Sequence, residues 1–581
     1  MKQAVNGRLS LTFAPEAGIT AIALHAAPNL FKAKGDWFIL YTPDVIRPKD
    51  CEIRVCTAED GTEKLIAMEY VHPPYTLRVS VLYDGDNEMR LHFALKVDME
   101  YPKDVWLALP FLAGLALGCD SPYITYPGGM LADLNGNMVA KTHPGFPLPY
   151  VLMDAQTGRG LMTEFPSRNV EFASSQNRNM DLRRIANREQ LENHRLLLRP
   201  GGEYADAAVL NLRGISNGWE EMCRLWRQGV REKYRMDAYR TAECAWFQDC
   251  LLTHFTYLYS KEAYDYEAGR VDIKKVLAQG EAFGGYDALI LWHQYPRLGL
   301  DERSQWDFFR DFPGGIEGLR LIADEAHLSG VKVFLPYKPW DVRFSESHDD
   351  SAYEIRELIE SGGVDGFFLD TMNSVPPSFR AAAKETGRDI AFCAEMHPGD
   401  QNAIEQVMGS WDQIWTSFPM PEIDVMRYAL PEHAAACIAR WHTDKRREAV
   451  IHRAIFSGVG LIIWQDVFGA YIPFEPEHRA LIKKYKAIWQ RFRICLKTAE
   501  PCPLAPSLAK GVYINLFPAP DGRAQVITLY NEASEAYEGP LMACEGKKAR
   551  EWLHDLPFKL ENGILAGSLP PESVAIVSVE A

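Results

Sequence analysis

Alternating hydrophobic and polar positions dominate the first 215 residues, and a period of two is typical of half-buried β-strands. Leu77, Val79 and Val81 alternate with polar neighbours, and the alternation returns from Leu91 to Val97. The turn-forming sequence Asp84-Gly85-Asp86-Asn87 separates the two runs, which predicts a hairpin with one buried face. Similar short runs recur between prolines and glycines, so this region is expected to form an antiparallel β-sandwich.

Helical spacing replaces this pattern between Asn217 and Tyr234, where Trp219, Met222 and Trp226 fall on one face. We interpret the segment as a linker helix whose tryptophans pack in a core. A GxSxG sequence, Gly214 to Gly218, directly precedes it. Because it follows an antiparallel region and not a parallel strand, it favours a linker that caps the helix over a nucleophile elbow.

Short apolar runs alternate with helical patterns from about residue 245 to 495. Two of these helical patterns end at Gly330 and at Gly362-Gly363, where glycine supplies a left-handed cap. Strands that alternate with helices pair in parallel, and about 250 residues match a (β/α)8 barrel; a doubly wound open sheet is the alternative. The expected strands are Leu251–Leu258, Tyr286–Trp292, Val331–Pro336, Val364–Leu369, Ile390–Ala394, Gln413–Ser417, Ala434–Trp441 and Gly460–Gln465.

Strand-like alternation returns after Cys502, with Val512, Ile514 and Leu516 on one face and a turn signal at Asp521-Gly522. The sequence therefore predicts a multidomain chain with a (β/α)8 TIM barrel at its centre. The expected parts are an N-terminal β-sandwich over 1–215, a linker helix over 216–240, the barrel over 241–500 and a small C-terminal β-sandwich over 501–581.

Composition narrows the range of partners. The chain has 62 Lys and Arg against 78 Asp and Glu, a formal charge of -16, which does not favour nucleic acid. None of the 11 cysteines forms a CxxC pair, so we expect free thiols and no zinc site. The N-terminus lacks the apolar region of a signal peptide, and no run of about 18 apolar residues occurs. We expect a cytoplasmic protein without a membrane span, metal or cofactor, and the sequence is compatible with a homo-oligomer.

Two of the expected barrel strands end in acidic residues. The fourth strand leads into Asp370, and the fifth leads into Glu395. The C-terminal ends of barrel strands meet at one mouth, and neighbouring strands lie about 4.8 Å apart, so both carboxyls are expected to face one cavity. Glycosidic cleavage needs such a pair, because one group attacks or activates water while the other protonates the leaving oxygen. The alternative is that each acid caps the helix that follows.

Other strand ends carry aromatic and polar residues that suit a sugar, since rings offer an apolar face and polar groups bond hydroxyls. Lys338 has an alternative role in neutralising Asp370 or Asp341, and His397 could orient Glu395. The predicted substrate-binding residues are His293, Tyr337, Lys338, Trp340, Asp341, His397, Asp444, Trp464 and Asp466.

Rival chemistries lack their motifs. The first strand offers only His254 where a metal-dependent barrel hydrolase needs a His-x-His pair, and no HxxxH, HExxH or phosphate-binding glycine loop occurs. A Schiff-base mechanism on Lys338 would leave Asp370 and Glu395 without a role.

The run Gly366 to Asp370, followed by Ala394-Glu395, resembles the nucleophile and acid/base strands of retaining α-glycosidases with (β/α)8 barrels. The segments Trp441 to Asp444 and Ala454 to Trp464 are similar to the last two barrel units of the α-amylase clan. The two flanking β-regions look more like those of α-galactosidases and endo-α-N-acetylgalactosaminidases.

This resemblance implies that Asp370 is the nucleophile and that Glu395 is the acid/base, as on strand five of amylase-like enzymes. In α-galactosidases the acid/base lies on strand six, where Glu422 or Asp424 would match. The sequence His442-Thr443-Asp444 departs from the usual His-Asp pair of the amylase clan, which weakens a role for Asp444 in stabilising the transition state.

The sequence thus predicts a glycoside hydrolase that acts on an α-linked carbohydrate by a retaining double displacement. Two alternatives stay open. One is a transglycosylase that uses the same residues, and the other is a non-catalytic carbohydrate-binding protein on a decayed barrel.

Overall fold

The computed structural model divides into two compact units, and the division falls between Trp226 and Arg227. Each unit is described by itself. The residues that the structure describes are 1–32, 35–60, 63–83, 87–98, 105–113, 116–119, 122–125, 130–132, 138–141, 149–154, 157–164, 195–198, 203–293, 303–343, 347–398, 401–412, 425–439 and 444–580.

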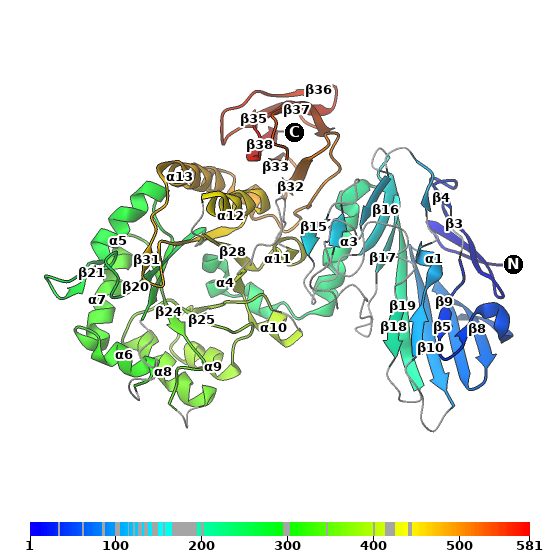
Figure 1. Ribbon diagram of the computed structural model, residues 1–581, viewed down its shortest axis with the longest axis horizontal. Helices are drawn as coiled ribbons and strands as arrows, with labels where there is room; N and C mark the ends of the chain where they lie inside the picture. Colours follow the sequence, from blue (N-terminus) through cyan, green and yellow to red (C-terminus); the bar gives the residue numbers. More distant parts are fainter. Residues whose placement is uncertain are drawn as a thin grey trace. The chain divides into compact units, whose positions relative to one another are not determined.

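The N-terminal unit is built around an antiparallel sheet of eight strands (Figure 1). The predicted hairpin is confirmed, because β9 and β10 pair antiparallel with Val79 opposite Phe93. Both side chains are fully buried, as the alternation requires. The strands in spatial order are β13 (Pro122–Thr125), β16 (Tyr150–Asp154), β17 (Arg159–Glu164), β19 (Glu203–Ile215), β10 (Glu88–Val97), β9 (Tyr75–Tyr83), β8 (Glu63–His72) and β7 (Glu52–Asp60).

Smaller sheets complete this unit and share its hydrophobic core, in which Trp37 and Phe38 are fully buried. The predicted helix forms as α3 (Gly218–Lys233), and Trp219, Met222 and Trp226 are buried. The remaining elements are β1 (Lys2–Val5), β2 (Leu9–Ala14), β3 (Gly18–Leu24), β4 (Phe31–Lys32), β5 (Ile39–Tyr41), β6 (Val45–Ile46), η1 (Pro48–Asp50), β11 (Val105–Ala108), α1 (Pro110–Ala113), β12 (Ala116–Leu117), β14 (Met130–Ala132), β15 (Met138–Lys141) and β18 (Arg195–Leu198).

The second unit contains a closed barrel of eight parallel strands, in which the last strand pairs with the first. Closure confirms the predicted barrel and rules out the open sheet. The strands are β20 (Leu252–Tyr257), β23 (Ala288–Trp292), β24 (Lys332–Tyr337), β25 (Gly366–Leu369), β26 (Ala391–Ala394), β27 (Gly409–Asp412), β28 (Ala434–Ala439) and β29 (Gly460–Trp464).

The described part of the sixth strand lies directly before the segment that the sequence predicted. The strand forms at Gly409–Asp412, whereas the prediction placed it at Gln413–Ser417, which lies outside the described residues. Its four residues include one large apolar side chain, Trp411, so the segment lacks the continuous apolar run by which buried parallel strands are recognised.

Helices surround the barrel (Figure 1). Gly330 follows α7 with a φ of 73°, and Gly363 follows α8 with a φ of 72°, so both predicted glycine stops are confirmed. The helices of this unit are η4 (Asp237–Arg240), α4 (Ala242–Phe247), α5 (Ile273–Gly280), η5 (Glu281–Phe283), α6 (Gln305–Asp311), α7 (Gly315–Leu328), α8 (His348–Glu360), α9 (Pro377–Glu385), α10 (Gln401–Gln406), α11 (Val425–Ala429), α12 (Asp444–Ser457), α13 (Pro476–Arg491) and α14 (Arg493–Leu496).

Two antiparallel sheets follow the barrel, and the four-stranded one packs on α12 through β33 and β38. Asn515 Nδ2 and Thr528 Oγ1 both donate to the carbonyl of Phe456, at 2.8 and 2.6 Å, which joins the sheets to the barrel. The four-stranded sheet has β32 (Val512–Pro518), β33 (Ala524–Asn531), β38 (Ser573–Glu580) and β35 (Lys548–Glu551), and the three-stranded sheet has β34 (Tyr537–Ala543), β37 (Ile564–Leu569) and β36 (Phe558–Glu561).

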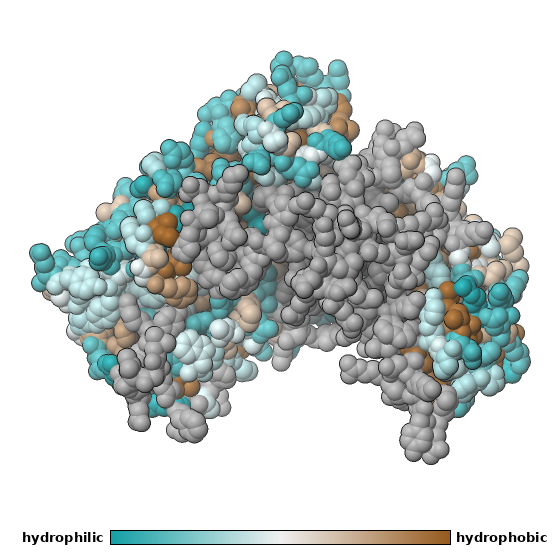
Figure 2. Space-filling view, viewed as in Figure 1, coloured by the Kyte–Doolittle hydropathy of each residue, from teal (hydrophilic) through white to brown (hydrophobic). Residues whose placement is uncertain are grey.

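On the face shown in Figure 2, hydrophobic residues of the described surface form small separate patches among hydrophilic ones. Within the described residues, no helix has the length and apolar character needed to span a membrane.

Candidate active site

A layer of aromatic rings fills the barrel just below its mouth, the end at which the strands finish. Phe255 of β20 lies 4.2 Å from Trp464 and 5.9 Å from Trp411 between ring centroids. Phe368 of β25 lies 3.9 Å from Trp411 and 5.6 Å from Trp292. Three of these four contacts join strands that are not neighbours, and Trp464 pairs with Phe255 on the adjacent strand, so the five rings point into the barrel and form its floor.

The two candidate catalytic carboxyls stand directly above this floor. Phe368 points inward, and side chains alternate along a strand, so Asp370, two positions further, points inward as well. Cys393 pairs with Phe368 across the ladder, which places Glu395 at the same level on the neighbouring strand. The structure therefore brings Asp370 and Glu395 together at the mouth, as the strand ends predicted.

A local irregularity at the end of β25 shapes this pair. The Glu395 amide donates to Leu369 O at 3.1 Å, but the next amide, Met396, donates to Met372 O at 3.1 Å. Asp370 and Thr371 form a turn directly after β25, and Thr371 has a φ of 56°, which a β-branched residue rarely adopts. In this turn the Thr371 N–H donates to Glu395 Oε2, at 2.5 Å.

The electrostatics of the site place one proton on the carboxyl pair. Burial, a hydrogen bond with Glu395 and the charge of Glu395 raise the pKa of Asp370 to about 8. Lys338 and the Thr371 N–H act in the opposite direction but do not reverse the shift. A pKa of about 8 favours the protonated form of Asp370 at neutral pH, and a carboxyl that keeps its proton near neutral pH is typical of a catalytic acid and base site.

A buried ion pair lies beside the carboxyls. Lys338 Nζ is 2.7 Å from Asp341 Oδ2, and both side chains are fully buried. Burial lowers the pKa of Lys338, while Asp341 and Asp370 oppose that change. Gln305 fixes the loop, because its Nε2 donates to the Lys338 carbonyl at 2.7 Å and its Oε1 accepts from the Lys338 amide at 2.9 Å.

Trp340 and His293 flank this ion pair. Trp340 is 49% exposed, and Lys338 Nζ lies 5.2 Å from the centre of its ring. His293 is fully buried and stacks on Phe309 at 5.1 Å. Burial and the charge of Lys338 lower the pKa of His293 well below its usual value, so the ring is neutral. Among the described residues, neither of its ring nitrogens has a hydrogen-bond partner, so both could bond water or a ligand hydroxyl.

Tyr337 and Trp464 occupy packing positions. The Tyr337 ring points toward the surrounding helices, 5.8 Å from Trp306 of α6 and 4.8 Å from Phe379 of α9. This location does not bring Tyr337 to the mouth. Trp464 belongs to the aromatic floor, and its Nε1 donates to the Asp466 carbonyl at 2.5 Å.

The other predicted residues are spread around the mouth. His397 Nδ1 and Ser410 Oγ are 2.6 Å apart, and Ser410 Oγ is also 2.6 Å from His433 Nε2, so His397 belongs to a chain of polar contacts behind strands five and six. Asp466 begins a small hairpin after strand eight. Asp444 is the first residue of α12, and its side chain is outside the described set, as are the strand-six alternatives Glu422 and Asp424.

A buried network that the sequence did not point to lies behind the junction of strands eight and one. Glu262 Oε1 accepts from Gln465 Nε2 at 2.7 Å and lies 3.3 Å from His254 Nε2, while Glu262 Oε2 accepts from Thr256 at 3.2 Å. Burial opposes the ionisation of Glu262, but these partners outweigh it and lower its pKa. A loop glutamate carries no local sign of such a role, because its partners are up to 203 positions away.

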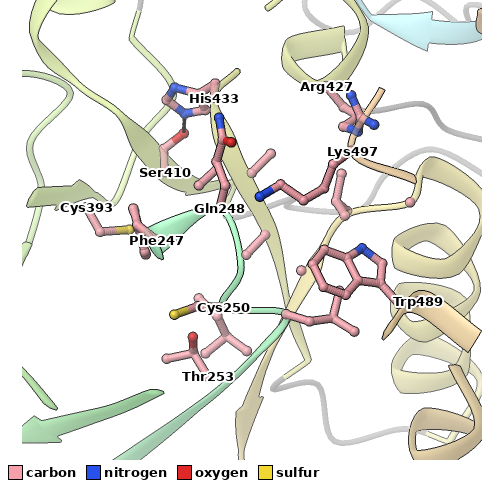
Figure 3. Close-up of a pocket in the computed structure, with 18 of the residues that line it drawn as sticks. Phe247, Gln248, Cys250, Thr253, Cys393, Ser410, Arg427, His433, Trp489 and Lys497 are labelled. Carbon is pink, nitrogen blue, oxygen red and sulfur yellow. Dashed lines mark hydrogen bonds between the residues drawn. The ribbon is translucent and has the colours of Figure 1, made fainter. Parts of the chain in front are cut away.

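A separate pocket lies at the opposite, N-terminal ends of the strands (Figure 3). Cys250, Thr253, Ser410 and His433 are among its lining residues. Barrel enzymes carry their chemistry at the C-terminal ends, and residues at this other end serve stability. We therefore assign the candidate active site to the mouth with Asp370 and Glu395.

The fold and this mouth define the class of protein, a (β/α)8 barrel with a paired Asp and Glu. No protein-family model and no curated protein matches the chain. Among solved structures, a quadruple mutant of the α-N-acetylgalactosaminidase NagBb from Bifidobacterium bifidum matches with a TM-score of 0.55 and 11% identity, over 91% of this chain and 98% of that one.

Two further structures match at lower TM-scores. The α-galactosidase from Lactobacillus brevis gives a TM-score of 0.46 and 11% identity, over 100% of this chain and 98% of that one. The GH36 α-galactosidase AgaB from Geobacillus stearothermophilus gives 0.46 and 12%, with the same coverage. The likeness to NagBb concerns the fold alone, and it agrees with the (β/α)8 barrel architecture that the sequence predicted.

Proposed function

We propose that the protein is a glycoside hydrolase that cleaves an α-linked sugar with retention of configuration. One observation carries the proposal: Asp370 and Glu395 stand at neighbouring strand ends above the aromatic floor, with a hydrogen bond between their side chains. Inverting enzymes keep their carboxyls about 6.5–9.5 Å apart to hold a water, whereas retaining pairs lie about 5–5.5 Å apart. A touching pair leaves no room for that water and favours retention.

In the proposed reaction, Asp370 attacks the anomeric carbon while Glu395 protonates the leaving oxygen. Glu395 then removes a proton from water, which hydrolyses the covalent intermediate. The raised pKa of Asp370 favours the proton on Asp370 in the free protein, so substrate binding has to transfer it to Glu395. The same observation supports the reverse division, in which Glu395 attacks and Asp370 is the acid, and variants distinguish the two.

The glycone is proposed to lie on the aromatic floor, with its hydroxyls bonded by the polar groups beside the carboxyls. The Asp341 carboxylate and the neutral ring of His293 provide acceptors, and Lys338 provides a donor. This arrangement suits a neutral sugar, because Asp341 already balances the charge of Lys338. Trp340 is exposed enough to stack on the sugar from the rim.

A panel of chromogenic α-glycosides tests the proposal, and it should include α-N-acetylgalactosaminides and α-galactosides. Release of the aglycone, with the first sugar product in the α-configuration by NMR, is the expected result. A folded protein that releases nothing would favour the carbohydrate-binding alternative, and transfer products at high acceptor sugar would favour the transglycosylase. We also propose that the protein is cytoplasmic and that its domains divide near residues 215, 240 and 500.

A further inference from the structure

A short hairpin directly follows the eighth barrel strand and rises from the mouth. Its strands β30 (Asp466–Val467) and β31 (Ala470–Tyr471) are joined by two residues, Phe468 and Gly469. The φ angles of these two residues are 52° and 86°, both positive, which defines a type I′ turn. Asn, Asp and Gly are favoured at the first position, and a bulky residue there is a conformational outlier.

The Phe468 ring gains little from burial in return for this strain. Phe468 is 65% exposed, and its ring centroid lies 5.3 Å from that of Trp464 at an angle of 63°. Trp464 is part of the aromatic floor, so the exposed ring stands at the edge of the proposed sugar site. Neither turn propensity nor core packing explains a phenylalanine at this position, whereas contact with a ligand does.

The hairpin is held firmly enough to present the ring in one place. The Gly469 amide donates to Asp466 Oδ1 at 3.0 Å, and the Ile472 amide donates to the Gln465 carbonyl at 2.8 Å. The Gln465 side chain is buried and bonds Glu262 Oε1 at 2.7 Å. The buried network behind strands eight and one therefore anchors the base of the hairpin.

We propose that Phe468 is a platform for the sugar on the leaving-group side of the cleaved bond, so that the substrate is a disaccharide, oligosaccharide or glycoconjugate with a pyranose at that position. This inference rests on the proposed function. A pyranose has an apolar face that fits a single exposed ring, and its hydroxyls can bond Asp466 and Tyr471 beside it. The surrounding exposed residues include Glu475 and Glu477, which suits a polar sugar better than an extended apolar partner.

The test compares an α-linked disaccharide with the glycosyl fluoride of the same glycone, which has no second ring. In Phe468→Asn, the ratio of kcat/KM for the disaccharide to that for the fluoride should fall about 3- to 10-fold, since ring contacts of this kind contribute about 0.5–1.5 kcal/mol. Phe468→Tyr should keep the ratio. The Tm of Phe468→Asn should rise, because Asn-Gly suits a type I′ turn. Tyr353→Asn removes a ring that is 70% exposed on α8 and should change neither value.

An unchanged ratio in Phe468→Asn would overturn the proposal, and a lowered Tm with it would identify Phe468 as a packing partner of Trp464. If the wild type hydrolyses neither substrate, the proposed function fails, and the platform is then tested by binding. A panel of α-linked disaccharides titrated against tryptophan fluorescence should saturate with the wild type and bind at least about threefold more weakly to Phe468→Asn. Absence of saturable binding by the wild type, or equal affinity in both proteins, would overturn the platform as well.

Discussion

The proton shared by Asp370 and Glu395 decides the chemistry at the scale of single residues. The turn at Asp370 and Thr371 holds a backbone N–H on Glu395, and the hydrogen bond and charge of Glu395 raise the pKa of Asp370. A change in Glu395 should therefore alter the protonation of Asp370.

Single substitutions separate the two roles. Asp370→Asn should lose activity on every substrate, because no glycosyl-enzyme can form. Glu395→Gln should lose about 10²–10⁴-fold on poor leaving groups but still release dinitrophenolate, which departs without protonation. Azide should then rescue the second step and give a glycosyl azide of retained configuration, measured by NMR. Normal activity of Glu395→Gln on natural glycosides would exclude Glu395 as the acid and direct the same test to Glu422 and Asp424.

The pH dependence follows from the raised pKa of Asp370. The pair needs one proton, so kcat/KM of the wild type should fall above about pH 8. In Glu395→Gln acting on a dinitrophenyl glycoside, no proton donor is needed, and this alkaline limb of the burst rate should disappear. An alkaline limb that persists in the variant would assign it to another group.

The same raised pKa affects stability. The unfolded chain, with a carboxyl pKa of about 3.9, binds fewer protons than the folded protein between pH 4 and 8, so the contribution of Asp370 to stability declines as the pH rises through that range.

The period of two along a strand explains which site residues could be predicted. Asp370, Glu395 and Lys338 each lie two positions beyond an inward-facing residue, so strand-end reasoning found them. Tyr337 is the residue before the inward-facing Lys338, so it lies on the opposite face of β24 and its ring points to the helices. Phe468 was not predictable, because its position depends on a turn conformation that its residue type disfavours.

At the scale of elements, the strands show why most of the barrel could be predicted. Strands such as β23 and β29 are buried along their whole length, so each gives an uninterrupted apolar run. The sixth strand contains Gly409, Ser410 and Asp412 around one tryptophan, and this part of it was not predicted; the predicted segment, Gln413–Ser417, lies outside the described residues. Closure of the sheet, and not the local pattern, determines where this strand lies.

The network around Glu262 joins β20 to the end of β29, because His254 and Gln465 both contact the Glu262 carboxylate. Glu262→Gln keeps the shape but removes the charge, and it should lower the free energy of unfolding by about 1–3 kcal/mol at neutral pH. Because the folded pKa of Glu262 is lowered, this contribution is present above the unfolded pKa and is lost as the pH falls through the folded one. Urea unfolding at several pH values should therefore show the two proteins converging in acid. Glu267→Gln, an exposed change in the same loop, is the control and should stay within about 0.5 kcal/mol.

At the pocket at the N-terminal ends of the strands, we expect a substitution to raise stability. Ala436 lines it from the middle of β28. Ala436→Val adds apolar volume and a β-branched residue to a strand, and it should raise the free energy of unfolding by about 0.5–2 kcal/mol. Because the carboxyl pair lies at the other end of the barrel, kcat/KM should not change. A folded variant that had lost activity would show that this pocket takes part in substrate binding.

At the scale of the whole molecule, the sheets after the barrel complete its core. They add no residue to the mouth described above, but the four-stranded sheet covers α12 on the outside of the barrel. The Phe456 carbonyl lies at the end of this helix, where intrahelical partners are missing, and it is satisfied by Asn515 and Thr528 from β32 and β33. Stability of the barrel and of the C-terminal sheets should therefore be linked.

Removing both donors tests this link. Asn515→Leu with Thr528→Val leaves the buried Phe456 carbonyl without its two bonds and should cost about 1–3 kcal/mol in urea unfolding. Each single variant should cost less than half of the double, because the carbonyl keeps one partner until both are gone. Thr20→Val removes a hydroxyl that also donates to a backbone carbonyl, but at the surface, and should stay within about 0.5 kcal/mol. Barrel tryptophan fluorescence and far-ultraviolet circular dichroism should follow one transition in the wild type. If the double variant unfolded at the wild-type urea concentration, the sheets would be an appended part with no role in holding the barrel together.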